Sequence, residues 1–366
     1  MNKYWILLII IPIQLNGQSI TGTILDSYLH QPVEFATIYI SGTTIGTVSN
    51  NDGSFIIQSG VFPCKLIISH VSYNTLVINI DQYSKSDLLI SIIPKVVEMS
   101  EVTIVDENLR EKNIQHFKDE FLGTDVWGKN ANLGNDSVLI FTVEYYNENT
   151  DDSAVIGKLK LFKVEATTPL NINLPLLGYY LQYELISFIE KYNPALKRNI
   201  INTSGYCYFK PVDTDSKLKA RSFKRNRLRA YYFSPQHFTR SLYNKKLPEN
   251  GYFVHEILNA DATKRPILRN EIADSCMSYI SDEAVITGLK DHSFIIRYCS
   301  DRRGIPLNLD ETDEFPSVEI SSIYFINNEC IIRKDGTRPG ESIIFGPGLG
   351  DKRVGATLPD NYNPEE

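Results

Sequence analysis

Alternating residues punctuated by glycines, from Thr21 to Phe55, constrain the fold more than any other stretch of the chain. Residues 20–26 and 33–41 alternate as β-strands do when one face is buried. Residues 50–53, Asn-Asn-Asp-Gly, are a strong turn signal because Asn, Asp and Gly tolerate positive φ. Short strands that follow one another without helical periodicity predict a β-sandwich.

Further strand-like segments extend this unit as far as Pro94. A family resemblance is carried by Gly22, Asp26, Pro32-Val33, Ala36, Gly42-Thr43, Gly46-Thr47, Asp52-Gly53 and Phe55. The pattern resembles the carboxypeptidase-like regulatory domain, a transthyretin-like, seven-stranded β-sandwich of many exported proteins of Gram-negative bacteria. One departure is Ser72, where the family usually has Gly before Tyr73. The resemblance implies a structural or docking module without catalytic residues, since the zinc of metallocarboxypeptidases lies in a separate domain.

The first 17 residues have the features of a signal peptide. Lys3 is followed by an apolar run from Tyr4 to Ile13, which is shorter than the ~20 residues a membrane helix needs. Such a segment would direct export to the periplasm, the outer membrane or the cell surface, and it would be cleaved after Gly17. An uncleaved anchor is the alternative. We expect no transmembrane helix in the mature chain.

The charge of the chain argues against nucleic acid as a partner. The formal net charge is −7, and removal of Lys3 with the signal segment makes it one unit more negative. A mildly acidic exported protein has no general attraction to nucleic acid or anionic lipid.

The length of 366 residues predicts two folding units. We expect a signal peptide at 1–17, the sandwich at 18–105, a linking helix at 106–123 and a β-rich domain at 124–366. Tyr and Phe are abundant, which favours strands. The predicted fold class is therefore mainly β, a sandwich followed by a larger β-rich α+β domain.

The most aromatic run of the second domain extends from Leu177 to Phe188. Alternation places Tyr179, Leu181, Tyr183 and Leu185 on one face, and Tyr180, Gln182, Glu184 and Ile186 on the other. Two interpretations follow: a central strand with one buried face, or an aromatic platform for a ligand.

A basic cluster follows between residues 217 and 229 and runs into Tyr231. It is interpreted either as a solvated loop leading into a helix or as a surface for an anionic partner. Ser234-Pro235 is a helix start, because Ser caps free N–H groups and Pro needs none there. The candidate ligand or partner surface comprises Tyr179, Tyr183, Arg221, Lys224, Arg225, Arg227 and Tyr231.

The family resemblance continues into this domain. It is carried by Leu177-Gly178-Tyr179, Gly205-Tyr206, Asn226-Arg227-Leu228, Ala230-Tyr231-Tyr232, Ser234, His237-Phe238 and Gly251-Tyr252. These residues are similar to an uncharacterised C-terminal region that accompanies the sandwich in one group of these bacterial proteins. That region has no activity to carry across.

No catalytic or metal-binding motif is present. The chain contains no HExxH and no GxSxG, and its glycine-rich residues 346–350 lack the Lys-Ser/Thr of a phosphate loop. The acidic residues 310–314 lack EF-hand spacing, so a solvated loop is favoured over a Ca²⁺ site. The five cysteines have no CxxC spacing and apolar neighbours, which predicts buried, unreactive thiols; a single disulfide or a zinc site are the alternatives.

These patterns predict a non-catalytic, exported cell-envelope protein. The sandwich would dock or space a second domain that binds a polymer, a peptide or a protein, such as an envelope protein or a polysaccharide. No cofactor and no carboxypeptidase activity are expected. The alternative is an exported hydrolase with an unrecognised site in the second domain, for which His237, Glu184, Arg225 and Arg227 are the candidates.

Overall fold

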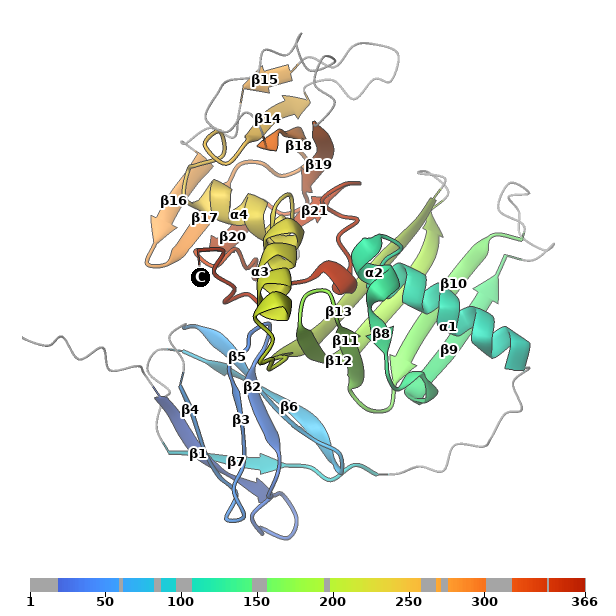
Figure 1. The fold of residues 1–366 in the computed structure, drawn as a ribbon, viewed down its shortest axis with the longest axis vertical. Helices are drawn as coiled ribbons and strands as arrows, with labels where there is room; N and C mark the ends of the chain where they lie inside the picture. Colours follow the sequence, from blue (N-terminus) through green and yellow to red (C-terminus); the bar gives the residue numbers. More distant parts are fainter. Residues whose placement is uncertain are drawn as a thin grey trace, which may run out of the picture. The chain divides into compact units, whose positions relative to one another are not determined.

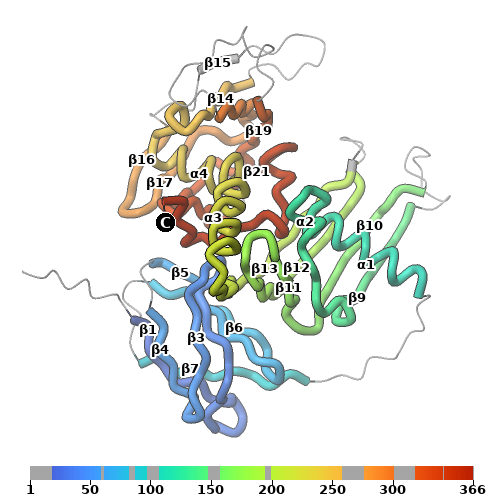
Figure 2. The backbone as a smooth tube through the Cα atoms, viewed as in Figure 1, coloured from blue at the N-terminus to red at the C-terminus, as the bar shows by residue number. Residues whose placement is uncertain are grey.

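A computed structural model describes residues 19–58, 62–81, 87–96, 107–146, 157–193, 198–257, 268–270, 276–300, 318–340 and 342–365. The chain divides into two compact units (Figures 1 and 2). One comprises residues 1–41 and 45–100, and the other comprises residues 42–44 and 101–366. The predicted signal peptide and the acidic residues 310–314 lie outside the described residues.

The first unit contains seven strands among its described residues, in two sheets. One sheet has the order β4-β1-β7, formed by Ser54–Gln58, Ser19–Asp26 and Leu88–Ile92. The other has the order β3-β2-β5-β6, formed by Gly46–Val48, Thr37–Ile40, Cys64–His70 and Tyr73–Ile80. The predicted seven-stranded sandwich is confirmed.

Side chains from both sheets form the core of the first unit. Ile20 and Ile24 of β1 are fully buried together with Ile38 of β2 and Leu66 of β5. The predicted turn at residues 50–53 is present: the Gly53 N–H donates to the Asn50 carbonyl, and Gly53 has a φ of +74°. A Cβ at this position would lie 2.4 Å from the Ile24 carbonyl oxygen, so the turn requires glycine.

The Asp26 carboxylate at the end of β1 holds the neighbouring turn. It accepts hydrogen bonds from the backbone N–H groups of Tyr28 and Leu29 and from the Tyr73 hydroxyl. The Leu29 N–H is the main cause that lowers the pKa of Asp26 below its ordinary value. At Ser72, where the family usually has Gly, the turn forms with the Ser72 N–H donating to Nδ1 of His70.

The second unit begins with helix α1 (Glu107–Leu122) and the short helix α2 (Val126–Asn130). Its first sheet has the order β8-β11-β12-β10-β9, with β13 on the other edge of β12. The bounds are β8 (Asn132–Leu133), β9 (Leu139–Tyr145), β10 (Leu159–Ala166), β11 (Leu170–Leu174), β12 (Tyr179–Asn193) and β13 (Arg198–Pro211).

One face of this sheet is buried beneath α1. The helix contributes Phe117 and Phe121, whose rings lie 5.0 Å from Phe188 and 5.1 Å from Tyr183. The helix that was predicted as a link therefore belongs to the core of the second unit. Packing of its apolar face onto the sheet stabilises it, as in most helices of this length.

The remainder of the second unit has its own core around helix α4 (Pro235–Tyr243). One sheet has the order β15-β14-β18-β19-β21, formed by Leu268–Asn270, Tyr252–Ile257, Ser293–Tyr298, Glu319–Phe325 and Ile343–Phe345. A smaller sheet has the order β16-β17-β20, formed by Met277–Ile280, Glu283–Thr287 and Glu329–Arg333. Helix α4 begins as predicted, because the Ser234 hydroxyl accepts a hydrogen bond from the His237 N–H. The prediction of a mainly β, α+β second domain is confirmed.

The basic cluster is helical, so the prediction of a solvated loop is wrong. Helix α3 spans Lys217–Tyr231, and Ser216 caps it by accepting a hydrogen bond from the Lys219 N–H. Lys, Arg and Leu are strong helix formers, and a cap supplies the start. In the sequence, the many charged residues make the short apolar stripe of this helix hard to recognise. The stripe ends in buried Ala230 and Tyr231.

All five cysteines are free, and Cys64, Cys299 and Cys330 are buried. Burial raises the pKa of Cys207 to about 12 and that of Cys330 to about 11, so both thiols stay protonated at neutral pH. The prediction of buried thiols holds for Cys64, Cys299 and Cys330, whereas Cys207 and Cys276 are only partly buried. In the part of the chain that the structure describes, no helix is long and apolar enough to cross a membrane.

Candidate functional site

Polar side chains cross the exposed face of the first sheet in two rows. The pairing of β8, β11, β12 and β13 aligns Asn132, Asn173, Tyr180 and Lys210 in one row. The next row contains Asn171 of β11, Gln182 of β12 and Tyr208 of β13. Neighbouring residues in such rows lie close enough to contact one ligand.

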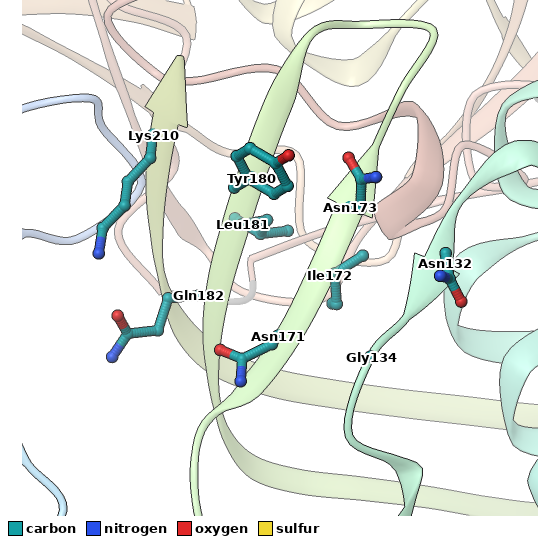
Figure 3. A pocket seen from close by; sticks show the side chains of 9 residues that line it. All are labelled: Asn132, Gly134, Asn171, Ile172, Asn173, Tyr180, Leu181, Gln182 and Lys210. Carbon is teal, nitrogen blue, oxygen red and sulfur yellow. The ribbon is translucent and has the colours of Figure 1, made fainter. Parts of the chain in front are cut away.

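These side chains, with the exception of Tyr208, line a cavity of about 310 Å³ (Figure 3). The lining is Asn132, Gly134, Asn171, Ile172, Asn173, Tyr180, Leu181, Gln182 and Lys210. The Tyr180 ring is 53% exposed, although its neighbours along β12, Tyr179 and Leu181, are buried. The lining thus offers four amides, one exposed ring and one ammonium group, and it includes no carboxylate, imidazole or thiol.

Backbone contacts of Asn171 hold the rim of the cavity. The Asn135 carbonyl Oδ1 accepts a hydrogen bond from the Asn171 N–H, and Asn135 Nδ2 donates to the Pro169 carbonyl. The Gly134 N–H donates to the Asn171 carbonyl. The loop after β8 is therefore held against the backbone of β11.

Helix α3 fixes the start of β12, where Tyr180 lies. Arg227 donates from Nε to the Leu177 carbonyl and from Nη2 to the Gly178 carbonyl. Its guanidinium carbon lies 4.0 Å from the centre of the Tyr179 ring, a cation–π contact. Asn226 donates to the Leu176 carbonyl. These contacts give Arg227 a positioning role for the strand that carries Tyr180 and Gln182.

The residues of the predicted ligand surface separate into two groups. Tyr179, Tyr183 and Tyr231 are buried, each less than 10% exposed, so the interpretation of the aromatic run as a strand with one buried face is confirmed. Burial raises the pKa of Tyr179 and Tyr231. Arg221, Lys224 and Arg225 are exposed on α3. None of the seven predicted residues, Arg227 included, lines the cavity on the sheet.

The hydrolase candidates do not gather in either of the two described cavities. His237 is buried among tyrosines, and its Nδ1 lies 2.9 Å from the Tyr252 hydroxyl. Glu184 lies on β12 opposite Tyr206. Among the described residues, no group of three or more His, Cys, Asp or Glu side chains is arranged to hold a metal ion.

The sequence contained one signal for this site. Alternation placed Tyr180 and Gln182 on the face opposite the buried tyrosines, and the segment Leu170–Leu174 alternates apolar residues with Asn171 and Asn173. Alternation alone does not show that these two strands pair, and it is their pairing that brings the two sets of polar side chains together.

Comparison with known families identifies the first unit. The family model of the CarboxypepD_reg-like domain matches residues 20–104. Residues 20–104 are thus similar to this domain family. This domain is a non-catalytic β-sandwich module, and the polar face described above lies outside it, in the second unit. A search of curated proteins found no match to the chain.

Two solved structures show the kind of likeness that the comparison found. A cohesin–X-dockerin complex from Acetivibrio cellulolyticus is 20% identical, covers 30% of this chain and 79% of that chain, and gives a TM-score of 0.20. A protein from Bacteroides fragilis, described as membrane-associated and of unknown function, is 12% identical, covers 53% of this chain and 98% of that chain, and gives a TM-score of 0.17.

Proposed function

We propose that this protein is an exported, non-catalytic envelope protein whose second unit binds a polysaccharide strand on the polar face of β8, β11, β12 and β13. The row of Asn132, Asn173, Tyr180 and Lys210 is the observation that carries the proposal. Export rests on the apolar segment from Tyr4 to Ile13, and docking or spacing rests on the CarboxypepD_reg-like domain.

The chemistry of the row suits a sugar. An amide side chain both donates and accepts, so it can pair with hydroxyl groups that also do both. The exposed Tyr180 ring offers an apolar face for the C–H side of a sugar ring. Lys210 adds a positive charge at the end of the row, which favours an acidic sugar at that position.

The composition of the cavity favours binding over hydrolysis. Glycoside hydrolysis typically needs a pair of carboxyl groups on either side of the scissile bond. The residues that line the cavity include none. We therefore expect the ligand to be held unchanged.

Loss of the Tyr180 ring tests the proposal. On an array of neutral and acidic oligosaccharides, we expect the full chain to bind at least one glycan, and Tyr180→Ala to weaken that binding about tenfold, as expected for a lost aromatic contact of about 1.4 kcal/mol. Lys210→Gln should selectively weaken binding of acidic glycans. Tyr145→Ala is the matched control, because Tyr145 is 60% exposed on β9 of the same sheet but does not line the cavity. Absence of binding on the whole array, or equal losses in the Tyr180 and Tyr145 variants, would refute the proposal.

A further inference from the structure

A second cavity, of about 390 Å³, lies within the second unit. It is lined by Ala230, Ser234, Pro235, Gln236, Gly336, Thr337, Arg338, Lys352, Ala356, Thr357, Leu358 and Asp360. It shares no residue with the cavity on the sheet. Two cationic side chains, Arg338 and Lys352, line it together with the N-terminus of helix α4, whose backbone dipole also favours an anion.

Arg338 is the residue that most requires a ligand. Its Nη1 nitrogen is buried and has no hydrogen-bond partner among the described residues. The guanidinium carbon lies 4.6 Å from the centre of the Phe345 ring, which holds the group in place. A buried donor without a partner is costly, and a buried charge without one costs more. An oxyanion in the cavity would supply the missing acceptor.

A further arginine near the cavity, Arg240, already has hydrogen-bond acceptors within the protein. Arg240 donates to the backbone carbonyls of Asp335, Tyr362 and Asp360. The Asp335 carboxylate accepts hydrogen bonds from the N–H and the hydroxyl of Thr337. Of the residues that line the cavity, Arg338 is the one with a buried side-chain nitrogen that has no hydrogen-bond partner among the described residues.

Asp360 is the acidic group of the cavity. Burial, together with the nearby Asp335, raises its pKa to about 7, whereas Arg240 and Arg338 oppose the shift. Lys352 also lines the cavity, and the Cys207 thiol lies close enough for Asp360 to affect its pKa. Asp360 thus changes charge near neutral pH, and its carboxylate form places a negative charge in the cavity.

We propose that this cavity binds an oxyanion, a carboxylate or phosphate group of a ligand, through Arg338, and that deprotonation of Asp360 weakens the binding. The direction of this pH dependence follows from the charge of Asp360. Above pH 7, the Asp360 carboxylate repels the anion, and below pH 7 the neutral carboxyl does not. If only the protonated form binds, a pKa of about 7 makes affinity at pH 8 about tenfold lower than at pH 6.

Calorimetric titration of the full chain tests this, with sodium acetate and sodium sulfate as probes at constant ionic strength. Neither probe changes its charge between pH 6 and pH 8. We expect one site for at least one probe; tighter binding of acetate indicates a carboxylate ligand, and tighter binding of sulfate indicates a phosphate ligand. Arg338→Gln should lower the affinity at least tenfold, and Asp360→Asn should remove the pH dependence.

The control is Arg221→Gln, which removes the same charge from the exposed surface of α3. Arg338→Lys keeps the charge without the planar donors, so it provides a folded comparison if Arg338→Gln does not fold. The proposal is overturned if the wild-type chain binds neither probe, or if the Arg338 and Arg221 variants lose affinity equally. If the affinity of the Asp360→Asn variant still depends on pH, the role of Asp360 is overturned.

Discussion

Replacing Phe188 with Ala is expected to lower the free energy of unfolding of the second unit by about 3–5 kcal/mol. Phe188 lies on β12 and is completely buried. Its ring lies 5.0 Å from Phe117 of α1, and 6.2 Å from both Phe121 of α1 and Phe162 of β10. Removal of the ring leaves a cavity between helix and sheet, which rigid aromatic neighbours cannot fill.

Urea unfolding measures this loss. Fluorescence of Trp127, which is buried in the same core, reports the second unit when Trp5 is replaced by Phe. The matched control is Ile186→Ala on the same strand, because Ile186 is 57% exposed. We expect the control to change stability by about 0.5 kcal/mol or less. Similar losses in the two variants would mean that α1 does not cover this face.

Replacing Gly355 with Ala is expected to destabilise the second unit by about 1–3 kcal/mol, and Gly355→Val by more. A Cβ at Gly355 would lie 2.5 Å from the Leu122 carbonyl oxygen and 2.7 Å from the Cα of Gly128. Both are backbone atoms, so no side chain can turn aside to make room. The close approach joins the end of α1, helix α2 and the 3₁₀ turn Val354–Ala356.

The same unfolding measurement tests this prediction, with Gly134→Ala as its control. A Cβ at Gly134 would meet only the Asn171 carbonyl oxygen, at 3.5 Å, which is an ordinary contact. We expect Gly134→Ala to leave stability nearly unchanged. If Gly355→Ala were equally neutral, the backbone segments could not be packed as closely as the structure places them.

The sandwich could be predicted because its signals are local. The glycine at position 53 is required by a positive φ, and the buried residues of β1 and β2 follow from period-two alternation. The same alternation predicted the buried face of β12. Short-range patterns of this kind depend only on neighbouring residues, so they can be recognised without knowledge of the fold.

The two candidate sites could not be predicted for the opposite reason. The row from Asn132 to Lys210 exists only through the register of four strands, which the sequence does not reveal. The second cavity joins Arg338, Lys352 and Asp360 to the start of α4, more than 90 residues earlier in the chain. Arg227 was predicted as part of a ligand surface, but its hydrogen bonds to the Leu177 and Gly178 carbonyls depend on tertiary contact.

If the amides of the sheet face bind the ligand, binding can be observed on those amides themselves. The most direct measurement is the nuclear magnetic resonance spectrum of the Asn and Gln side-chain NH₂ groups, recorded with and without the glycan that binds best. We expect the signals of Asn132, Asn171, Asn173 and Gln182 to shift, and those of Asn130 and Gln115, which lie on helices α2 and α1, to stay in place. Saturable glycan binding that leaves the four signals unchanged would show that the ligand binds elsewhere.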